Sequence, residues 1–313
     1  MRRFLIKIAI FSVILYGLAW GLDYIISMGT TKISGYPHQP WTEMRNHTFD
    51  CDGVIMGTSR GLEHYNPYIL DSLIGHSFYN LGMGGYPIDK QLMKYRFYCN
   101  YNPKPKYVIL DVDYITMTAP KSLVHDFQSE QYLPLIYDKC MRQELRDMGY
   151  SIWDVYFPLV RWFGYQTHIK RGVFDYFNIQ HHTEYKSYKG FSPDPGSWNP
   201  NNLRSKDSIP GIIDESQKVL LETALREWKT DSVYVIMVNS PKYYAYSAMN
   251  QNRQEEIRYF DSLSIHFDIP YFDYCSHSWM CLDSTLFNNG YHLTPVGADI
   301  FSAEVARNIV LEK

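Results

Sequence analysis

The chain has no strong excess of charge of either sign and only one long hydrophobic run. Its 30 basic and 33 acidic side chains give a formal net charge of -3 at pH 7. A general electrostatic attraction to phosphate backbones is therefore absent, and no nucleic acid is predicted as a partner. The mean hydropathy of -0.32 excludes a bundle of many membrane helices. One membrane helix is still compatible with this composition.

Cysteine is also scarce. Five cysteines are an odd number, so they cannot all pair within the chain. Cys275 and Cys281 are close enough in sequence to pair in an oxidising compartment, but buried free thiols are the default expectation. No C-x-x-C unit occurs. His181 and His182, near Glu184, are adjacent and usually point apart, and no third ligand stands at metal-binding spacing. No metal and no other cofactor is predicted.

What the chain does have is length and aromatic side chains. A chain of 313 residues can form one large domain or two small ones with a sizeable core. Aromatic residues make up 16% of it, with 28 Tyr, 16 Phe and 7 Trp. Because aromatic rings combine a stacking face with a polar rim, they suit both packed cores and sugar-binding surfaces.

The amino terminus carries a membrane-insertion signal. Three basic residues within the first seven precede the uncharged stretch from Ile8 to Leu22. A helix from Phe4 to Met28 would be about 37 Å long and would cross a hydrocarbon core of about 30 Å, with Lys7 and Asp23 reaching for the two interfaces. Since the basic end stays in the cytoplasm, residues 1–28 are predicted to be a single-pass signal anchor, with the rest of the chain periplasmic or extracellular.

A linker and a folded domain are predicted after this helix. Residues 29–50 are polar and turn-rich and have no apolar periodicity, which is typical of a linker between membrane and domain. Residues 51–313 are predicted to form the domain. Removal of the helix as a signal peptide is the main alternative, for which Gly17 and Ala19 are the nearest approximation to a cleavage site, and a buried helix of a soluble protein is the other.

Short apolar runs alternate with helical patterns along the domain. Strand character is found at Gly53–Met56, Ser77–Leu81, Tyr107–Val112, Val233–Val238 and Tyr271–Phe272. Helical patterns are found at Pro67–Ile74, Pro87–Tyr98, Ile213–Trp228, Gln254–Phe267 and Pro295–Leu311. The alternation predicts an α/β fold, a three-layer sandwich whose parallel central sheet is covered on both faces. In such folds the chemistry lies at the carboxyl ends of the strands.

Residues from about 116 to 210 break the alternation. They are rich in aromatic side chains, including Trp153, Phe157 and Trp162, and end in a segment with several prolines. We interpret them as an insertion, partly helical at its start, that is able to cover the active-site face as a lid.

Two motifs follow predicted strands. Ser59, in Gly57-Thr58-Ser59-Arg60, is placed to be a nucleophile if a histidine elsewhere acts as its base. The alternative is a simple helix N-cap at Thr58 or Ser59. In Asn80-Leu81-Gly82-Met83-Gly84-Gly85 the glycines allow a close approach of backbone to a ligand and offer N–H groups to an oxyanion, although they also suit a tight turn.

A third motif precedes the last predicted helix. His292, in Asn289-Gly290-Tyr291-His292-Leu293-Thr294-Pro295, sits in a loop at the rim of the predicted sheet, with a helix starting near Pro295. Taken alone, it could be a capping or packing histidine. It gains weight because Ser59 and the glycines appear in the expected order on equivalent strand ends.

Together the three motifs resemble the SGNH (GDSL-like) hydrolase superfamily, in the membrane-anchored branch that includes accessory acyl-transfer proteins acting on cell-surface polymers. The resemblance covers roughly residues 51–113 and 232–311. The similar blocks are Gly57-Thr58-Ser59-Arg60, Asn80-Leu81-Gly82, and His292-Leu293-Thr294 followed by Gly297. The resemblance implies an SGNH or flavodoxin-like α/β fold.

The resemblance also implies residue roles. Ser59 would be the nucleophile and its own N–H part of the oxyanion hole, the N–H of Gly82 would be the next donor, and His292 would be the general base. The family's Asp three residues before the histidine is here Asn289, which cannot stabilise an imidazolium as a carboxylate would. Either the dyad works alone, or Asp283 substitutes as the orienting acid, or the site is weak or inactive.

A further block of the family, Gly-x-Asn-Asp with an oxyanion-hole Asn, is missing. Asn239 follows the matching strand and is the candidate substitute. Asp111 and Asp113 end another predicted strand and could bind a hydroxylated substrate or a cation, or be a solvated strand end. Arg60 is expected to pair with a substrate carboxylate or with a structural acid.

The function predicted from these features is that of a membrane-anchored, extracytoplasmic esterase or O-acyltransferase acting on an envelope glycan through a Ser–His acyl-enzyme. The alternative is a catalytically inactive protein of the same fold that binds or scaffolds cell-surface polysaccharide. The lipid bilayer is the expected partner of the N-terminal helix. The resemblance alone implies a second partner, a multi-spanning membrane acyltransferase.

Overall fold

Five apolar runs form one parallel sheet. Its strands are β1 (Gly53–Met56), β2 (Phe78–Asn80), β3 (Tyr107–Asp111), β4 (Tyr234–Asn239) and β5 (Tyr271–Asp273). The spatial order is β2-β1-β3-β4-β5, and every neighbouring pair is parallel. The inner strands β1, β3 and β4 are buried along almost their whole length, which explains their continuous apolar sequences. The predicted mixed α/β class with a parallel sheet is confirmed.

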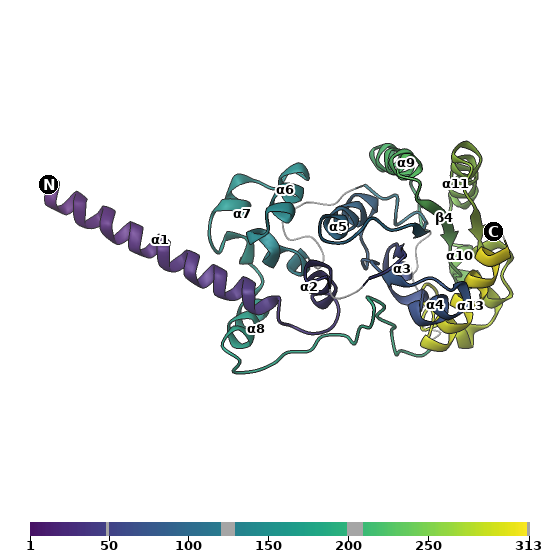
Figure 1. Cartoon of the computed structure of the whole chain (residues 1–313), viewed down its shortest axis with the longest axis horizontal. Helices are drawn as coiled ribbons and strands as arrows, with labels where there is room; N and C mark the ends of the chain where they lie inside the picture. The colour runs from purple at the N-terminus through teal and green to yellow at the C-terminus, as the bar shows by residue number, and fades with distance from the viewer. Residues whose placement is uncertain (48–49, 120–128, 199–208, 312–313) are drawn as a thin grey trace. The chain divides into compact units, whose positions relative to one another are not determined.

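The structure, a computed structural model, describes residues 1–47, 50–119, 129–198 and 209–311 (Figure 1). The chain folds as two compact units. Unit 1 combines Met1–Asn46 with Lys121–Lys186, and unit 2 combines His47–Pro120 with Ser187–Lys313 and contains the sheet. The predicted insertion at residues 116–210 is thus divided, with its larger part in the unit of the N-terminal helix.

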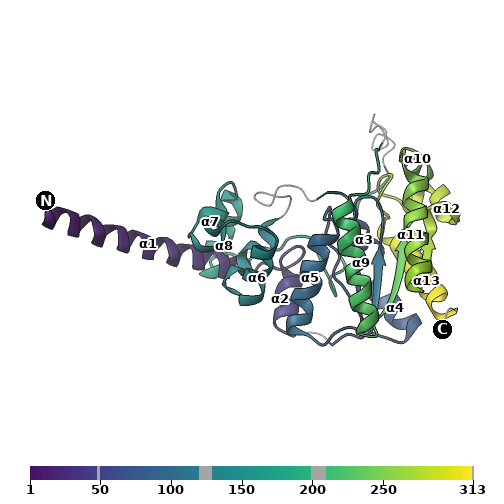
Figure 2. The same ribbon diagram turned by 90° about the horizontal axis from the view of Figure 1, so that it is seen from above.

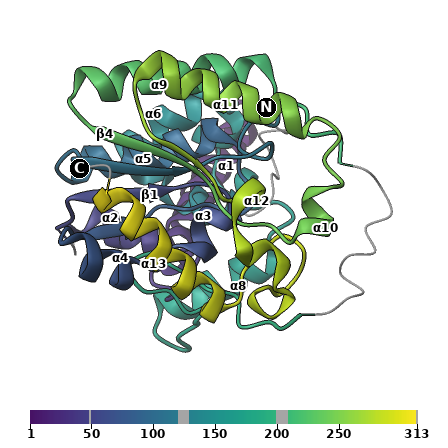
Figure 3. The same ribbon diagram turned by 90° about the vertical axis from the view of Figure 1, so that its right-hand side faces the viewer.

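The helices of unit 2 form two sets by their contacts. One set is α3 (Ser59–His64), α4 (Pro67–Ile74) and α13 (Pro295–Leu311), and the other is α5 (Ile88–Tyr101), α9 (Glu215–Thr230) and α11 (Arg253–Phe267). Figure 3 shows α13 beside α4 and α9 beside α11. Shorter elements are α10 (Tyr244–Ser247), α12 (Tyr274–His277), η5 (Trp279–Leu282) and η6 (Ser284–Leu286).

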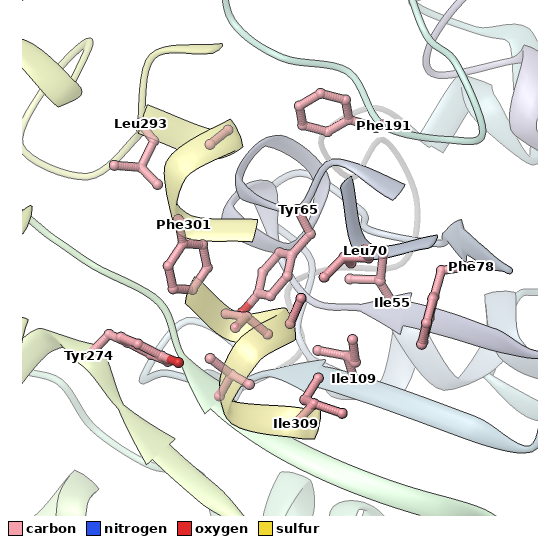
Figure 4. Packing of buried hydrophobic residues seen from close by; sticks show 14 of the residues in the cluster. Ile55, Tyr65, Leu70, Phe78, Ile109, Phe191, Tyr274, Leu293, Phe301 and Ile309 are labelled. Carbon is pink, nitrogen blue, oxygen red and sulfur yellow. The ribbon is translucent and has the colours of Figure 1, made fainter. Parts of the chain in front are cut away.

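The main hydrophobic core of unit 2 lies between the sheet and α13. Ile55 of β1 and Ile109 of β3 belong to the same buried cluster as Phe301 and Ile309 of α13 (Figure 4). Tyr65, directly after α3, packs edge to face against Phe301 with ring centroids 5.2 Å apart. Burial of these side chains fixes α3 and α13, and with them the loops that precede both helices.

Unit 1 is built around the first helix. Its elements are α1 (Arg2–Thr30), α2 (Gln39–Arg45), η1 (Ser129–Gln131), η2 (Leu133–Tyr137), α6 (Lys139–Asp147), α7 (Ile152–Tyr156), η3 (Val160–Trp162) and α8 (Gln166–Tyr176). Helices α1 and α8 approach closely at Gly29 and Gly172, where a Cβ atom on Gly172 would lie 2.6 Å from the carbonyl oxygen of Ile26. Residues 29–50, predicted as a linker, contain α2 with the buried side chains of Trp41 and Met44.

Helix α1 is long and apolar enough to span a membrane. No residue before Asp23 is buried, whereas the last turns of the helix are covered by unit 1. Figure 2 shows α6, α7 and α8 near the carboxyl end of α1, with its amino-terminal part projecting from them. Asp23, which was expected to reach for a membrane interface, has a buried carboxylate that is paired with Arg161 and accepts a hydrogen bond from Tyr137 Oη at 2.7 Å.

Candidate active site

Ser59 and His292 meet in unit 2. The Ser59 Oγ and His292 Nε2 atoms are 2.7 Å apart, although the residues are 233 positions apart in sequence. Ser59 begins α3 directly after β1, and Gly57 makes this sharp turn possible. It has φ of 155°, and a Cβ atom there would lie 2.8 Å from the Cβ of Asp111. The two strongest site residues of the sequence are therefore in hydrogen-bond contact.

Asn289 sets the orientation of the His292 ring. The amide oxygen of Asn289 accepts hydrogen bonds from the backbone N–H groups of Tyr291 at 2.8 Å and His292 at 3.0 Å. Because these groups can only donate, they hold the amide oxygen on their side and turn the NH2 group of Asn289 toward His292 Nδ1, 3.1 Å away. Nδ1 then accepts, so the ring proton lies on Nε2 and points at Ser59.

Asp283 does not take the place of the missing acid in this geometry. Its carboxylate is at the surface, where it caps η6 by accepting hydrogen bonds from the backbone N–H of Thr285 at 2.9 Å and its hydroxyl at 2.7 Å. Among the hydrogen bonds of the described residues, none joins Asp283 to His292. The partner of His292 Nδ1 is the side-chain amide of Asn289.

The His292 ring is held neutral at physiological pH. Its pKa is lowered from the ordinary 6.5 to about 4, chiefly by burial and then by the charge of Arg60. The carboxylates of Asp194 and Asp113 oppose this change. Sequence reasoning missed Asp194, which lies in the irregular Phe191–Trp198 segment and has no motif around it. The pKa of Glu63 is raised to about 8, chiefly by burial and then by the negative charge of Asp194.

Two of the three predicted oxyanion-hole donors, Gly82 and Asn239, are already engaged. The N–H of Gly82 donates to the side-chain oxygen of Asn80 at 2.8 Å, and the Asn80 amide donates in turn to the carbonyl oxygen of Gly61 at 2.8 Å. The side chain of Asn239 is buried and bonded to Arg60 and Glu256. For Gly82 to bind an oxyanion, its bond to Asn80 must be shared or broken.

His64 supports the loop that carries His292, and no sequence signal pointed to it. Its buried ring accepts a hydrogen bond on Nε2 from the backbone N–H of Leu293 at 3.1 Å, and its Nδ1 lies 3.0 Å from Ser240 Oγ. Burial and the positive charge of Arg60 hold its pKa well below the ordinary value, so that Nε2 stays free to accept. His64 thereby fixes the residue next to His292.

Arg60 is the centre of a buried charge cluster. Its guanidinium lies 3.1 Å from carboxylate oxygens of both Asp111 and Asp113, and all three side chains are inaccessible to solvent. Asp111 also accepts a hydrogen bond from Tyr65 Oη at 2.6 Å, and Asp113 accepts one from Tyr291 Oη. The expectations of a substrate or cation site, or of a solvated strand end, are therefore wrong for Asp111 and Asp113. Arg60 pairs with structural acids.

The cluster shifts the pKa values of Asp111 and Asp113 in opposite directions. Burial acts to raise the pKa of Asp113, but Arg60 and Lys242 outweigh it and lower the pKa. Burial raises the pKa of Asp111 in spite of Arg60. Asp113 is thus the firmly ionised partner of Arg60, and it also receives the backbone N–H groups of Ile115 and Thr116.

The remaining candidates lie outside this site. In unit 1, His182 Nδ1 is 2.5 Å from Asp175 Oδ2 and Glu184 pairs with Arg171, and no cluster able to hold a metal occurs among the described residues. All five cysteines, including Cys275 and Cys281, are free thiols.

No family model matches the chain, and no curated protein matches it.

Proposed function

We propose that the chain is a membrane-anchored enzyme of the SGNH type, an esterase or O-acyltransferase that acts outside the cytoplasm on an envelope glycan. The observation that carries the proposal is the 2.7 Å contact between Ser59 Oγ and His292 Nε2. A serine hydroxyl needs an adjacent base to become a nucleophile, and this distance lies within the range that proton transfer requires.

The fold supports the proposal in two ways. Ser59 follows β1 at its carboxyl end, the edge where open α/β sheets place their chemistry. The two helix sets, one with α13 and one with α9, fit the three layers of an SGNH or flavodoxin-like sandwich.

The chemistry follows from the two side chains. Ser59 Oγ attacks the ester carbonyl while its proton passes to His292 Nε2. The bond to the leaving alcohol then breaks, and the alcohol takes that proton, leaving an acyl-Ser59 ester. A water or sugar hydroxyl attacks the acyl group in the second half and gives its proton to Nε2. The bond between the acyl group and Ser59 Oγ then breaks, and Oγ takes the proton back from Nε2. The backbone N–H of Ser59, and that of Gly82 once freed from Asn80, stabilise the oxyanion.

Asn289 limits the rate in this mechanism. Proton transfer from Ser59 needs an unprotonated Nε2, but the NH2 group of Asn289 favours the tautomer with the proton on Nε2. Turning the amide over sacrifices two hydrogen bonds from backbone N–H groups, at about 0.5–1.5 kcal/mol each. We therefore propose a slow enzyme rather than a fully optimised one.

An aromatic pair beside the catalytic loop favours a sugar as acceptor. The Trp198 and Tyr243 rings pack edge to face with centroids 4.7 Å apart, and the backbone N–H of Tyr243 donates to the carbonyl oxygen of Gly290, two residues before His292. Such rings stack on sugar faces. Anchoring by α1 would hold the site near envelope polymers and near a multi-spanning acyltransferase able to supply acyl groups.

A serine-directed fluorophosphonate tests the proposal on the full chain in detergent micelles. We expect labelling of the native chain, loss of labelling in S59A, and loss of at least most of it in H292A. S262A, which removes an exposed serine hydroxyl on α11, is the matched control and should label normally. A folded native chain that does not label would overturn the enzyme proposal.

The Asn289 amide favours one second candidate, a non-catalytic protein that binds envelope polysaccharide through the same surface. In that case S59A should bind glycan as tightly as the native chain, while substitution of Trp198 by alanine should weaken binding. Glycan microarrays with the native chain, S59A and W198A separate the two functions.

A further inference from the structure

The segment from Ile152 to Phe163 gives unit 1 a strongly apolar surface. We name this segment, which contains α7 and η3, the collar. Its exposed large side chains are Ile152, Trp153, Tyr156, Phe157, Val160 and Phe163. Trp153 is 61% exposed and Phe163 is 77% exposed. Large apolar side chains exposed together in this way mark a contact with a membrane or a partner.

None of the exposed side chains within the collar is charged, and the exposed Arg146 of α6 touches its edge by donating a hydrogen bond to Tyr156 Oη at 3.0 Å. The segment contains two charged residues, Asp154 and Arg161, and both are buried. Asp154 is used in a capping box with Ser151 at the start of α7, and Arg161 pairs with the buried Asp23 of α1. Both charges and the backbone N–H of Asp154 thus have partners within unit 1, which favours a surface placed against lipid.

The collar lies directly beside α1. The ring of Phe157 packs against that of Tyr16 with centroids 6.3 Å apart. Tyr137 of η2 packs in the same way against Trp20 at 6.0 Å and Tyr24 at 5.3 Å. Aromatic rings from the collar and from η2 therefore contact α1 between Tyr16 and Tyr24.

The length of α1 gives the depth of this contact. The part without buried residues, Arg2–Leu22, is about 31 Å long at 1.5 Å per residue, close to the hydrocarbon thickness of about 30 Å. The extracytoplasmic edge of the hydrocarbon core then falls near Leu22, directly before the first buried residue of α1. Tyr16 lies six residues deeper, about 9 Å along the axis. Phe157, which contacts Tyr16, reaches the same level.

We propose that the collar is a second membrane contact, with its apolar side chains inserted into the outer interface of the bilayer that α1 crosses. Insertion by about 5–10 Å is the usual depth for interfacial segments. An open hollow of about 510 Å³, lined mainly by collar residues from Pro158 onward, offers room for lipid acyl chains. Together, α1 and the collar hold unit 1 in one orientation on the membrane. The proposal rests on the anchoring part of the proposed function.

Quenching of tryptophan fluorescence by brominated lipids tests the collar in the full chain. The chain is placed in phosphatidylcholine nanodiscs whose acyl chains are brominated either close to the headgroup or close to the methyl end. The variants are W153F for the collar, W20F for α1, and W279F as the matched control, because Trp279 is 56% exposed in unit 2. A fourth variant, F163W, adds an indole to the collar.

We expect W153F to lose part of the quenching by lipid brominated near the headgroup, and F163W to gain such quenching. W279F should quench like the native chain. If W20F loses quenching while W153F and F163W behave like the native chain, the anchor stands, the collar proposal is overturned, and a protein partner is left as the occupant. If W20F also changes nothing, the anchor itself is wrong. F163W keeps the test decisive should W153F fail to fold.

Discussion

Ser59 and Arg60 are neighbours at the start of α3, yet their side chains enter two different polar groups. Ser59 meets His292, whose other nitrogen faces a neutral amide. Arg60 meets two carboxylates, each with further hydrogen-bond donors around it. The carboxylates Asp111 and Asp113 thus stabilise a structural cation, whereas His292 has no carboxylate at Nδ1. Arg60 thus has both of its carboxylate partners, whereas the Ser59–His292 pair has an amide where a carboxylate would orient the ring.

The two groups are linked by charge and by chain. Arg60 lowers the pKa of His292, and Tyr291, next to His292, donates a hydrogen bond to Asp113. The cluster therefore positions the loop that carries His292 and keeps its ring neutral. Substitutions in one group should chiefly change stability and those in the other chiefly reactivity.

The largest effect is expected for R60M. Removing the guanidinium leaves Asp111 and Asp113 buried without their main counter-charge, which typically costs about 3–5 kcal/mol of unfolding free energy. Urea unfolding of the full chain in micelles, followed by tryptophan fluorescence, measures the loss. R226M is the control, because Arg226 pairs with Glu222 on the surface of α9 and such pairs contribute below about 1 kcal/mol. Equal losses in both variants would contradict the structural role of the cluster.

The next effect is the gain expected for N289D. One carboxylate oxygen can keep the two backbone hydrogen bonds while the other accepts a hydrogen bond from Nδ1–H, which leaves Nε2 free to accept from Ser59. Avoiding a loss of up to about 3 kcal/mol should raise the fluorophosphonate labelling rate at pH 7 by up to about 100-fold.

The double variant S59A/N289D is the control for this gain, and it should not label. An unchanged rate in folded N289D would show that the tautomer does not limit the site and would strengthen the polysaccharide-binding candidate.

The same comparison shows what could be predicted from sequence. Buried parallel strands have continuous apolar sequences, so the sheet was recognisable, and Ser59 and His292 each stand at the boundary of a strand or loop with a helix. The partner of Asp111 could not be predicted, because only the folded chain brings Arg60 to the end of β3. Asp194 lies in a segment without periodicity. The burial of Asp23 could not be predicted either, because the hydropathy of a helix does not show where another segment of the chain covers it.

The pH profile should separate reactivity from stability. Because the pKa of His292 is lowered to about 4, labelling should stay nearly constant from pH 8 to 5, whereas an ordinary histidine of pKa 6.5 would lose about 30-fold at pH 5. Stability behaves differently. Between pH 6.5 and 4 the unfolded chain binds a proton that the native histidine does not, so unfolding becomes easier as pH falls through this window. Labelling that falls at pH 6.5 in folded protein would contradict the burial of the ring.

The smallest effect is expected for D194N, which tests how far a charge outside the dyad acts on it. The Asp194 carboxylate is half-buried and raises the pKa of His292 against the stronger effects of burial and Arg60. Its removal should move the acid limb of the labelling profile to lower pH by less than about one unit, since solvent screens such a charge. D261N, on the exposed face of α11, is the matched control and should leave the limb in place. A shift to higher pH in D194N would mean that Asp194 acts through the loop it stabilises and not through its charge.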